Sequence, residues 1–193
     1  MKKVIILTLL LINVLVFNTP KIMAQNCGEE RWSVKTLSDP DTIDINFNYI
    51  VPSTIGEQIK IINIPNSQTG KRSRYEDTLY SLNCLIIAFK KENDKDIHIV
   101  LKDINTNETM VGELISDECD EVKNTSRYNL FVELNKWFRE NIGHPTSKLK
   151  HPKEPIPVKI TGVSFYDFLH GQKGMASNGR EIHPILSMSL IKN

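Results

Sequence analysis

One amphipathic helical pattern stands among segments that otherwise have the periodicity of β-strands, and this contrast constrains the fold most. Between residues 127 and 142 (RYNLFVELNKWFRENI), large apolar side chains recur at the three- and four-residue spacing of a helix buried on one face. They are Leu130, Phe131, Leu134, Trp137, Phe138 and Ile142. An aromatic stripe at this spacing is typical of core packing rather than of a cofactor site, so we expect this face to pack on a sheet.

Strand-like segments flank the helix on both sides. Three precede it and two follow it, and each alternates or concentrates β-branched and aromatic residues between turn-forming stretches. They cover residues 78–89, 96–102, 110–115, 158–168 and 181–191. The second shows the clearest alternation, with Ile97, Ile99 and Leu101 on one face and Asp96, His98 and Val100 on the other.

The last segment contains a proline. Its alternation places one set of side chains on the first face, namely Ile182, Pro184, Leu186, Met188 and Leu190. The second face then holds Glu181, His183, Ile185, Ser187 and Ser189. Because Pro184 has no N–H to donate, we expect this strand to lie at an edge there or to carry a bulge.

The order strand, strand, strand, helix, strand, strand is that of an OB-fold, with the helix between the third and fourth strands. We therefore predict a mostly β, α+β fold: a five-stranded OB-like barrel over residues 77–193, with residues 25–76 as an N-terminal extension packed on it. Within the extension, Trp32 and Val34 suggest a short extended segment. Ser53 or Thr54 followed by Glu57 predicts a capped short helix.

The first residues have the pattern of a bacterial signal peptide. Lys2 and Lys3 precede an apolar run over residues 4–17, and Ala24 ends an acceptable cleavage site. The run is too short to span a bilayer comfortably, and no later run is apolar enough. We expect residues 1–24 to be removed and the remainder to be periplasmic or secreted.

Charge argues against one class of partner. The chain has 24 Lys and Arg and 23 Asp and Glu, and loss of residues 1–24 removes three lysines. A near-neutral protein has no global field to attract nucleic acid. The second and third strands also lack the aromatic side chains on which single-stranded bases stack, so nucleic acid is an unlikely partner.

Three cysteines follow the predicted signal peptide. Cys84 lies within an apolar strand pattern and is interpreted as a small buried side chain. Cys27 and Cys119 lie in polar, loop-like surroundings. Because an exported protein is in an oxidising compartment, we predict a Cys27–Cys119 disulfide.

The predicted topology brings polar side chains that are distant in sequence to one pole of the barrel. There the loop after the first barrel strand (KKENDK) meets the long loop before the last strand (DFLHGQKGMASNGR). The pole would gather Asp94, Asp96, His98, Glu113, His170, Glu181 and His183.

Two interpretations of this pole remain open. Three imidazoles among carboxylates could bind a divalent metal, with His98, His170 and His183 as ligands, or act in acid–base chemistry. Alternatively, the same residues form a hydrogen-bond network that braces two long loops. Neither a metal nor any other cofactor is required by the pattern, and no ligand pair has the HExxH spacing.

Four segments resemble a family of uncharacterised exported bacterial proteins: CGEERWSVKT, KENDKDIHIVL, MVGELI and TGVSFYDFLHGQKGMASNGREIHPIL. The family typically has a D-x-H strand, a Gly-Phe-Phe-Asp-like strand, His-Gly-Gln and Glu-x-His-Pro. Ser164 and Tyr166 depart slightly from that pattern. The resemblance implies a shared domain and a shared polar site, but no activity. That site would comprise Asp96, His98, His170, Glu181 and His183.

Two functions are compatible with these features. The first is an exported binding module that holds a saccharide, peptide or protein at the polar pole through Asp96, His98, Glu113, His170, Gln172, Glu181 and His183. The alternative is a metal-dependent hydrolase, such as a nuclease or phosphoesterase, in which a metal-bound water is the nucleophile and Glu113 or Glu181 is the base. The sequence leaves open whether the protein is an enzyme.

Overall fold

The structure is a computed structural model that describes residues 27–28, 30–61, 71–73, 75–169 and 171–192. The predicted signal peptide and His170 lie outside these ranges. Of the helices in the described ranges, none has the length and apolar character to cross a membrane.

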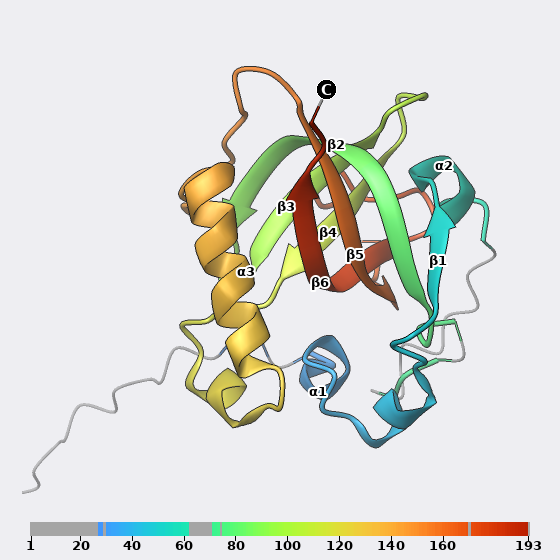
Figure 1. Cartoon of the computed structure of the whole chain (residues 1–193), viewed down its shortest axis with the longest axis vertical. Coiled ribbons are helices and arrows are strands. Elements are labelled where there is room, and N and C mark those ends of the chain that lie inside the picture. The colour runs from blue at the N-terminus through green and yellow to red at the C-terminus, as the bar shows by residue number, and fades with distance from the viewer. Residues whose placement is uncertain (1–26, 29, 62–70, 74, 170, 193) are drawn as a thin grey trace, which may run out of the picture.

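Five strands close into a barrel, as predicted (Figure 1). They are β2 (Leu79–Lys91), β3 (Ile97–Asp103), β4 (Thr109–Leu114), β5 (Ile156–Tyr166) and β6 (Arg180–Leu190). The order around the sheet is β2-β3-β4-β6-β5, and β5 pairs with β2 to close it. Only β4 and β6 run parallel within this ring, which gives the OB-like arrangement.

A sixth strand extends the sheet. The segment β1 (Ile50–Ser53) pairs in parallel with the start of β2, so part of the N-terminal segment is hydrogen-bonded to the barrel. It leads into α2 (Ile55–Gln58), the predicted capped helix. Thr54 is its N-cap, and Thr54 and Glu57 form a reciprocal capping box.

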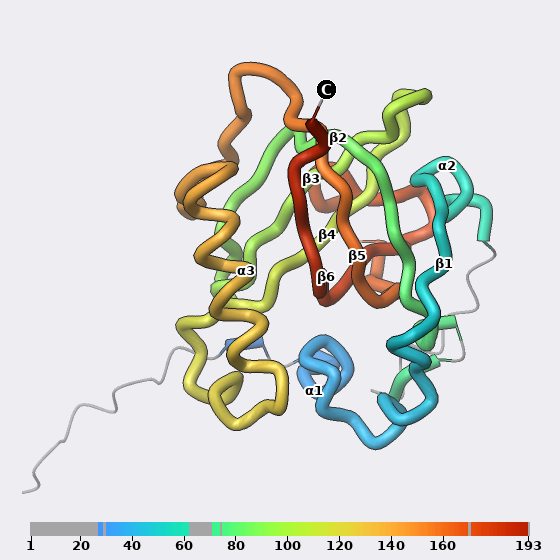
Figure 2. The backbone as a smooth tube through the Cα atoms, in the orientation of Figure 1, coloured from blue at the N-terminus to red at the C-terminus, as the bar shows by residue number. Residues whose placement is uncertain are grey.

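The helix α3 (Tyr128–Asn141) lies beside the barrel between β4 and β5 in the chain (Figure 1). Leu134 and Phe138 of this helix are buried in the same apolar cluster as the inward-facing side chains of the strands. Phe138 meets Phe89 of β2 edge to face, with ring centroids 5.2 Å apart. Figure 2 shows the connector from α3 to β5 arching over one end of the barrel.

The N-terminal segment differs from its prediction at Trp32 and Val34, which lie in a short helix, α1 (Trp32–Lys35), rather than in an extended segment. Beyond it lies a 3-10 turn, η1 (Pro40–Asp44).

Two residues that precede α1 are held in place by bonds to distant parts of the chain. Cys27 forms the predicted disulfide with Cys119, just before the 3-10 turn η3 (Asp120–Asn124), and Arg31 forms a buried ion pair with Glu76. The periodicity of a local stretch of sequence cannot predict bonds between residues so far apart in the chain.

The predicted face assignment of the last strand is wrong at Ile185 and Leu186. The pairing of β6 with β5 shifts register on either side of Ile185, the residue after Pro184, so the bulge that we expected is present, while β6 is an internal strand of the barrel. The shift changes the phase of the alternation. Ile185 therefore joins Ile182 and Met188 in the core, whereas Leu186 packs outside it and Leu190 is exposed.

Candidate functional site

The predicted polar pole forms, and its centre is buried on the outer side of the barrel wall. Ile97, Ile99 and Leu101 of β3 face the core, so the alternate positions Asp96 and His98 face outward. His98 lies opposite Glu113 in the β3–β4 ladder. Glu181 lies opposite Val111 on the other side of β4, which brings β6 beside the same face. All five predicted strand-borne site residues are buried there, namely Asp96, His98, Glu113, Glu181 and His183.

A chain of close contacts runs through the pole. Nδ1 of His98 lies 3.4 Å from Oε1 of Glu113, and Oε2 of Glu113 lies 3.1 Å from Nδ1 of His183. On the far side of the imidazole, Nε2 of His183 lies 3.7 Å from Oδ2 of Asp96. Glu113 is thus the central carboxylate, placed between two histidines.

The described residues of the long loop between β5 and β6 cover this face. Nε2 of His98 donates a hydrogen bond of 2.9 Å to the carbonyl oxygen of Lys173. Gly174 lies against Val100 of β3 so closely that a Cβ would collide with it. The backbone N–H of Asp167 bonds Gly179 O and joins the two ends of the loop. The outer side of β3, where OB-folds commonly bind ligands, is therefore occupied by the protein's own chain.

His98 and His183 have different surroundings. Both nitrogens of His98 are engaged, one with Glu113 and one with the loop, so this residue links β4 to the loop. In His183 neither nitrogen has a hydrogen-bond partner within the described part of the chain, because its close approach to Glu113 lacks the required alignment. His183 is completely buried, and Oδ2 of Asp96 is likewise unpaired there.

The environment sets different charge states for the three carboxyl groups. Burial raises the pKa of Asp96 to about 6. Burial and the negative charge of Glu113 raise the pKa of Glu181 well above its usual range. Glu113 is also buried, but the charge of His183 and the hydrogen bond from His98 outweigh burial and lower its pKa to about 2. Glu113 is therefore the most acidic of the three carboxyl groups, whereas burial favours the protonated form of Glu181.

Lys35 of α1 also belongs to the pole, although we did not predict it. Burial alone would lower the pKa of its amine, but the nearby carboxylates of Glu113, Asp94 and Asp167 raise it. No spacing in the sequence connects Lys35 to these residues. The predicted Cys27–Cys119 disulfide was the one feature of the sequence that indicated this proximity, because it brings the start of the described chain towards the end of β4.

A pocket of about 230 Å³ connects the pole with solvent. Its lining contains Lys35, Glu92, Asn93, Asp94, Glu113, Asp167 and Gln172. The predicted ligand residue Gln172 is thus in the wall of the pocket, and its buried Oε1 has no hydrogen-bond partner in the described ranges. Four carboxylates and one amine make this wall acidic. Glu113 is the residue that the pocket shares with the buried cluster.

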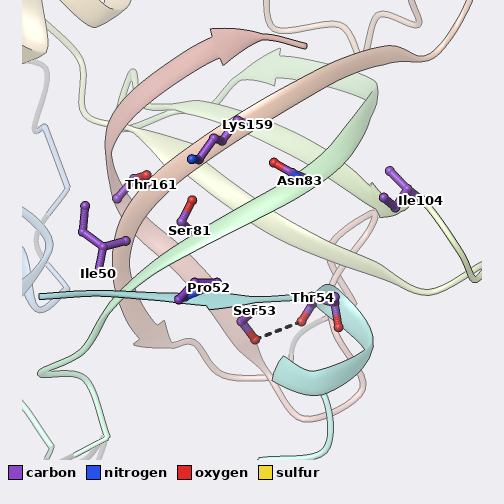
Figure 3. Close-up of a pocket in the computed structure, with 9 residues that line it drawn as sticks. All are labelled: Ile50, Pro52, Ser53, Thr54, Ser81, Asn83, Ile104, Lys159 and Thr161. Atoms are coloured by element: carbon purple, nitrogen blue, oxygen red, sulfur yellow. Dashed lines mark hydrogen bonds between the residues drawn. The ribbon is translucent and has the colours of Figure 1, made fainter. Parts of the chain in front are cut away.

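A larger groove of about 400 Å³ lies elsewhere, across β1, β2 and β5 (Figure 3). Its floor consists of short polar side chains from paired strands, Ser81 opposite Thr161 and Asn83 opposite Lys159. Lys159 is the one charged residue among the described residues that line it. None of these described side chains has an unpaired buried polar atom, so the groove shows less sign of a built site than the polar pole does.

Comparison with known proteins finds no matching family model and no matching curated protein. The resemblance to exported bacterial proteins therefore stays a prediction. The case for a function rests on the geometry of the pole.

Proposed function

We propose that the protein is an exported binding module whose ligand carries positive charge and is held at the polar pole. The observation that carries this proposal is the acidic pocket that leads from solvent to Glu113. Opposite charge favours both encounter and binding, and the effect is strongest in a narrow, partly desolvated site. Among the ligand classes considered from the sequence, a cationic segment of a peptide or protein fits this wall better than a neutral saccharide.

A binding panel at low and high salt tests the proposal. The probes are divalent metal chlorides, spermidine, an oligolysine peptide, a neutral oligosaccharide and an acidic peptide, each titrated by calorimetry. We expect binding of cations only, weakened by salt because screening acts on the exposed rim of the pocket. Glu92→Gln combined with Asp167→Asn should weaken binding, because both carboxylates line the pocket.

Glu140→Gln is the matched control, since Glu140 is an exposed carboxylate on the helix α3 and does not line the pocket. Selective binding of the neutral oligosaccharide, unaffected by the pocket variant, would contradict the proposal and direct attention to the groove in Figure 3.

The second candidate is a metal-dependent hydrolase at the same pole, and the state of Glu181 favours it. Burial favours the protonated form of Glu181, and a protonated carboxyl group can act as a general acid towards a leaving group. In this candidate Glu181 is the acid rather than the base. Turnover of bis-p-nitrophenyl phosphate with added Mn²⁺ or Zn²⁺, lost in Glu181→Gln, would support it; no turnover with either metal would exclude this substrate class.

A further inference from the structure

His183 combines complete burial with two unpaired ring nitrogens. A neutral imidazole carries one N–H donor and one acceptor nitrogen, and burying either without a partner is unfavourable. In the described part of the chain neither nitrogen of His183 is hydrogen-bonded, and Oδ2 of Asp96, 3.7 Å from Nε2, is also unpaired. An imidazole nitrogen and a carboxylate oxygen without other bonds are free to act as metal ligands.

Three donors converge at this point. One ligand atom each from Asp96, Glu113 and His183 lie within 4.8 Å of one another. The residues come from the approach to β3, from β4 and from β6, which are neighbours in the closed barrel. The ring of His183 also packs against Phe165 of β5, with centroids 5.1 Å apart. Two of the three donors therefore lie on barrel strands, and the third, Asp96, directly precedes one.

The residues around the three donors suit a metal site. His98 bonds Glu113 through Nδ1 and the loop through Nε2, so it can orient Glu113 as an outer-sphere partner without being a ligand itself. The backbone N–H of Ser116 bonds Oδ1 of Asp96 at 2.7 Å, which fixes that carboxylate and leaves Oδ2 directed elsewhere. The acidic pocket supplies a path for a cation as far as Glu113.

The donor set indicates the class of ion. Two carboxylates neutralise a divalent charge, and one imidazole favours a first-row transition metal such as Zn²⁺ or Mn²⁺. Ca²⁺ takes six to eight oxygen ligands, more than the two carboxylates of this donor set supply. Three protein ligands leave at least one coordination position for water or for a ligand that arrives through the pocket.

We infer that Asp96, Glu113 and His183 form a binding site for a divalent transition-metal ion such as Zn²⁺ or Mn²⁺. This inference rests on the proposed function and specifies the class of cation that binds at the pole. It differs from the alternative ligand set His98, His170 and His183 considered from the sequence, because both nitrogens of His98 are engaged; His170 lies outside the described residues.

The test uses the full mature chain, carrying no histidine tag and purified without chelator. Calorimetry with ZnCl₂, MnCl₂ and CaCl₂ should give one site for the transition metals and weaker binding of Ca²⁺. His183→Ala, Glu113→Gln and Asp96→Asn should each lower the Zn²⁺ affinity at least about tenfold. His144→Ala is the matched control, because it removes an exposed imidazole of the connector; its affinity should equal that of the wild type.

A second measurement needs no variant and therefore covers the case in which a substitution prevents folding. Pulsed electron paramagnetic resonance of the Mn²⁺-loaded wild-type protein should show coupling to an imidazole nitrogen. Absence of that coupling, or undiminished Zn²⁺ affinity in folded triad variants, would overturn the inference. If spermidine or oligolysine binds and the metals do not, the metal inference fails and the proposed function stands. If no cation binds, both fail.

Discussion

Nδ1 of His183 lies 3.1 Å from Oε2 of Glu113, and this pair sets the charge of the pole. Burial would raise the pKa of Glu113, but the charge of His183, together with the hydrogen bond from His98, lowers it to about 2. In His183→Ala we expect the Glu113 pKa to rise from about 2, because burial remains while the charge of His183 is lost. Carboxyl ¹³C chemical shifts followed through a pH titration measure this value. An unchanged Glu113 pKa would show that His183 has no electrostatic role, and His144→Ala serves as the control.

Asp96→Asn should make the metal-free protein more stable at pH 7.5 than the wild type. The pKa of Asp96 is about 6 in the folded protein against a usual 3.8, so the folded state holds the proton more tightly. As pH rises from about 4 to 6, the unfolded chain loses this proton first and the wild type loses up to about 3 kcal/mol of stability. The side-chain amide of the variant cannot ionise, and its oxygen can keep the bond from Ser116 N–H.

Urea denaturation of Asp96→Asn and wild type at several pH values measures the difference, which should vanish near pH 4. Glu113 has the opposite sign: its lowered pKa stabilises the fold above about pH 4.5, and this contribution is lost as pH falls towards 2. Both proteins contain Glu113, so subtracting the two profiles isolates Asp96. A difference that persists unchanged to pH 4 would contradict the assignment.

Glu76→Gln should be among the most destabilising single changes. Both oxygens of Glu76 bond the guanidinium of Arg31, at 2.8 and 2.6 Å, and they also accept the backbone N–H groups of Tyr166 and Ser73. Loss of the negative charge leaves Arg31 buried without a counter-ion, which costs about 3–5 kcal/mol. The exposed Lys91–Glu118 pair is the comparison: Glu118→Gln should cost under about 1 kcal/mol. Equal losses in the two variants would refute this ranking.

Removal of the disulfide should destabilise the protein by about 2–5 kcal/mol, because Cys27 and Cys119 are 92 residues apart and their bond constrains a long loop in the unfolded chain. Cys27→Ala combined with Cys119→Ala can be compared with the wild type by urea denaturation. Cys84→Ala is the control, since Cys84 is a buried free thiol. A double variant as stable as this control would mean that the crosslink contributes little.

Much of the barrel could be predicted because its elements carry their own periodicity. Ile97, Ile99 and Leu101 alternate with Asp96, His98 and Val100 on a strand, and Leu134 and Phe138 recur at helical spacing. These patterns follow from which face is buried, so the element order and the approximate strand limits could be predicted from local sequence. The convergence of Asp96, His98, Glu113, Glu181 and His183 then followed from the topology.

The features that were missed depend on contacts between distant residues. The helix α1 has four residues, too few for a periodic signal, and β1 is recognised only through its pairing with β2. Lys35 reaches the pole because α1 is anchored there. The bulge next to Pro184 places Ile185 rather than Leu186 in the core. A rule of strict alternation cannot predict where a bulge will change the facing of the side chains.

The parallel addition of β1 to a closed barrel has a consequence for self-association. A closed barrel exposes no free edge, whereas an added strand restores one, and free edges template aggregation between identical chains. Here the added edge has only four residues, contains Pro52 and turns directly into α2. A strand this short, with one N–H missing, offers a second copy too few backbone bonds to extend the sheet from molecule to molecule.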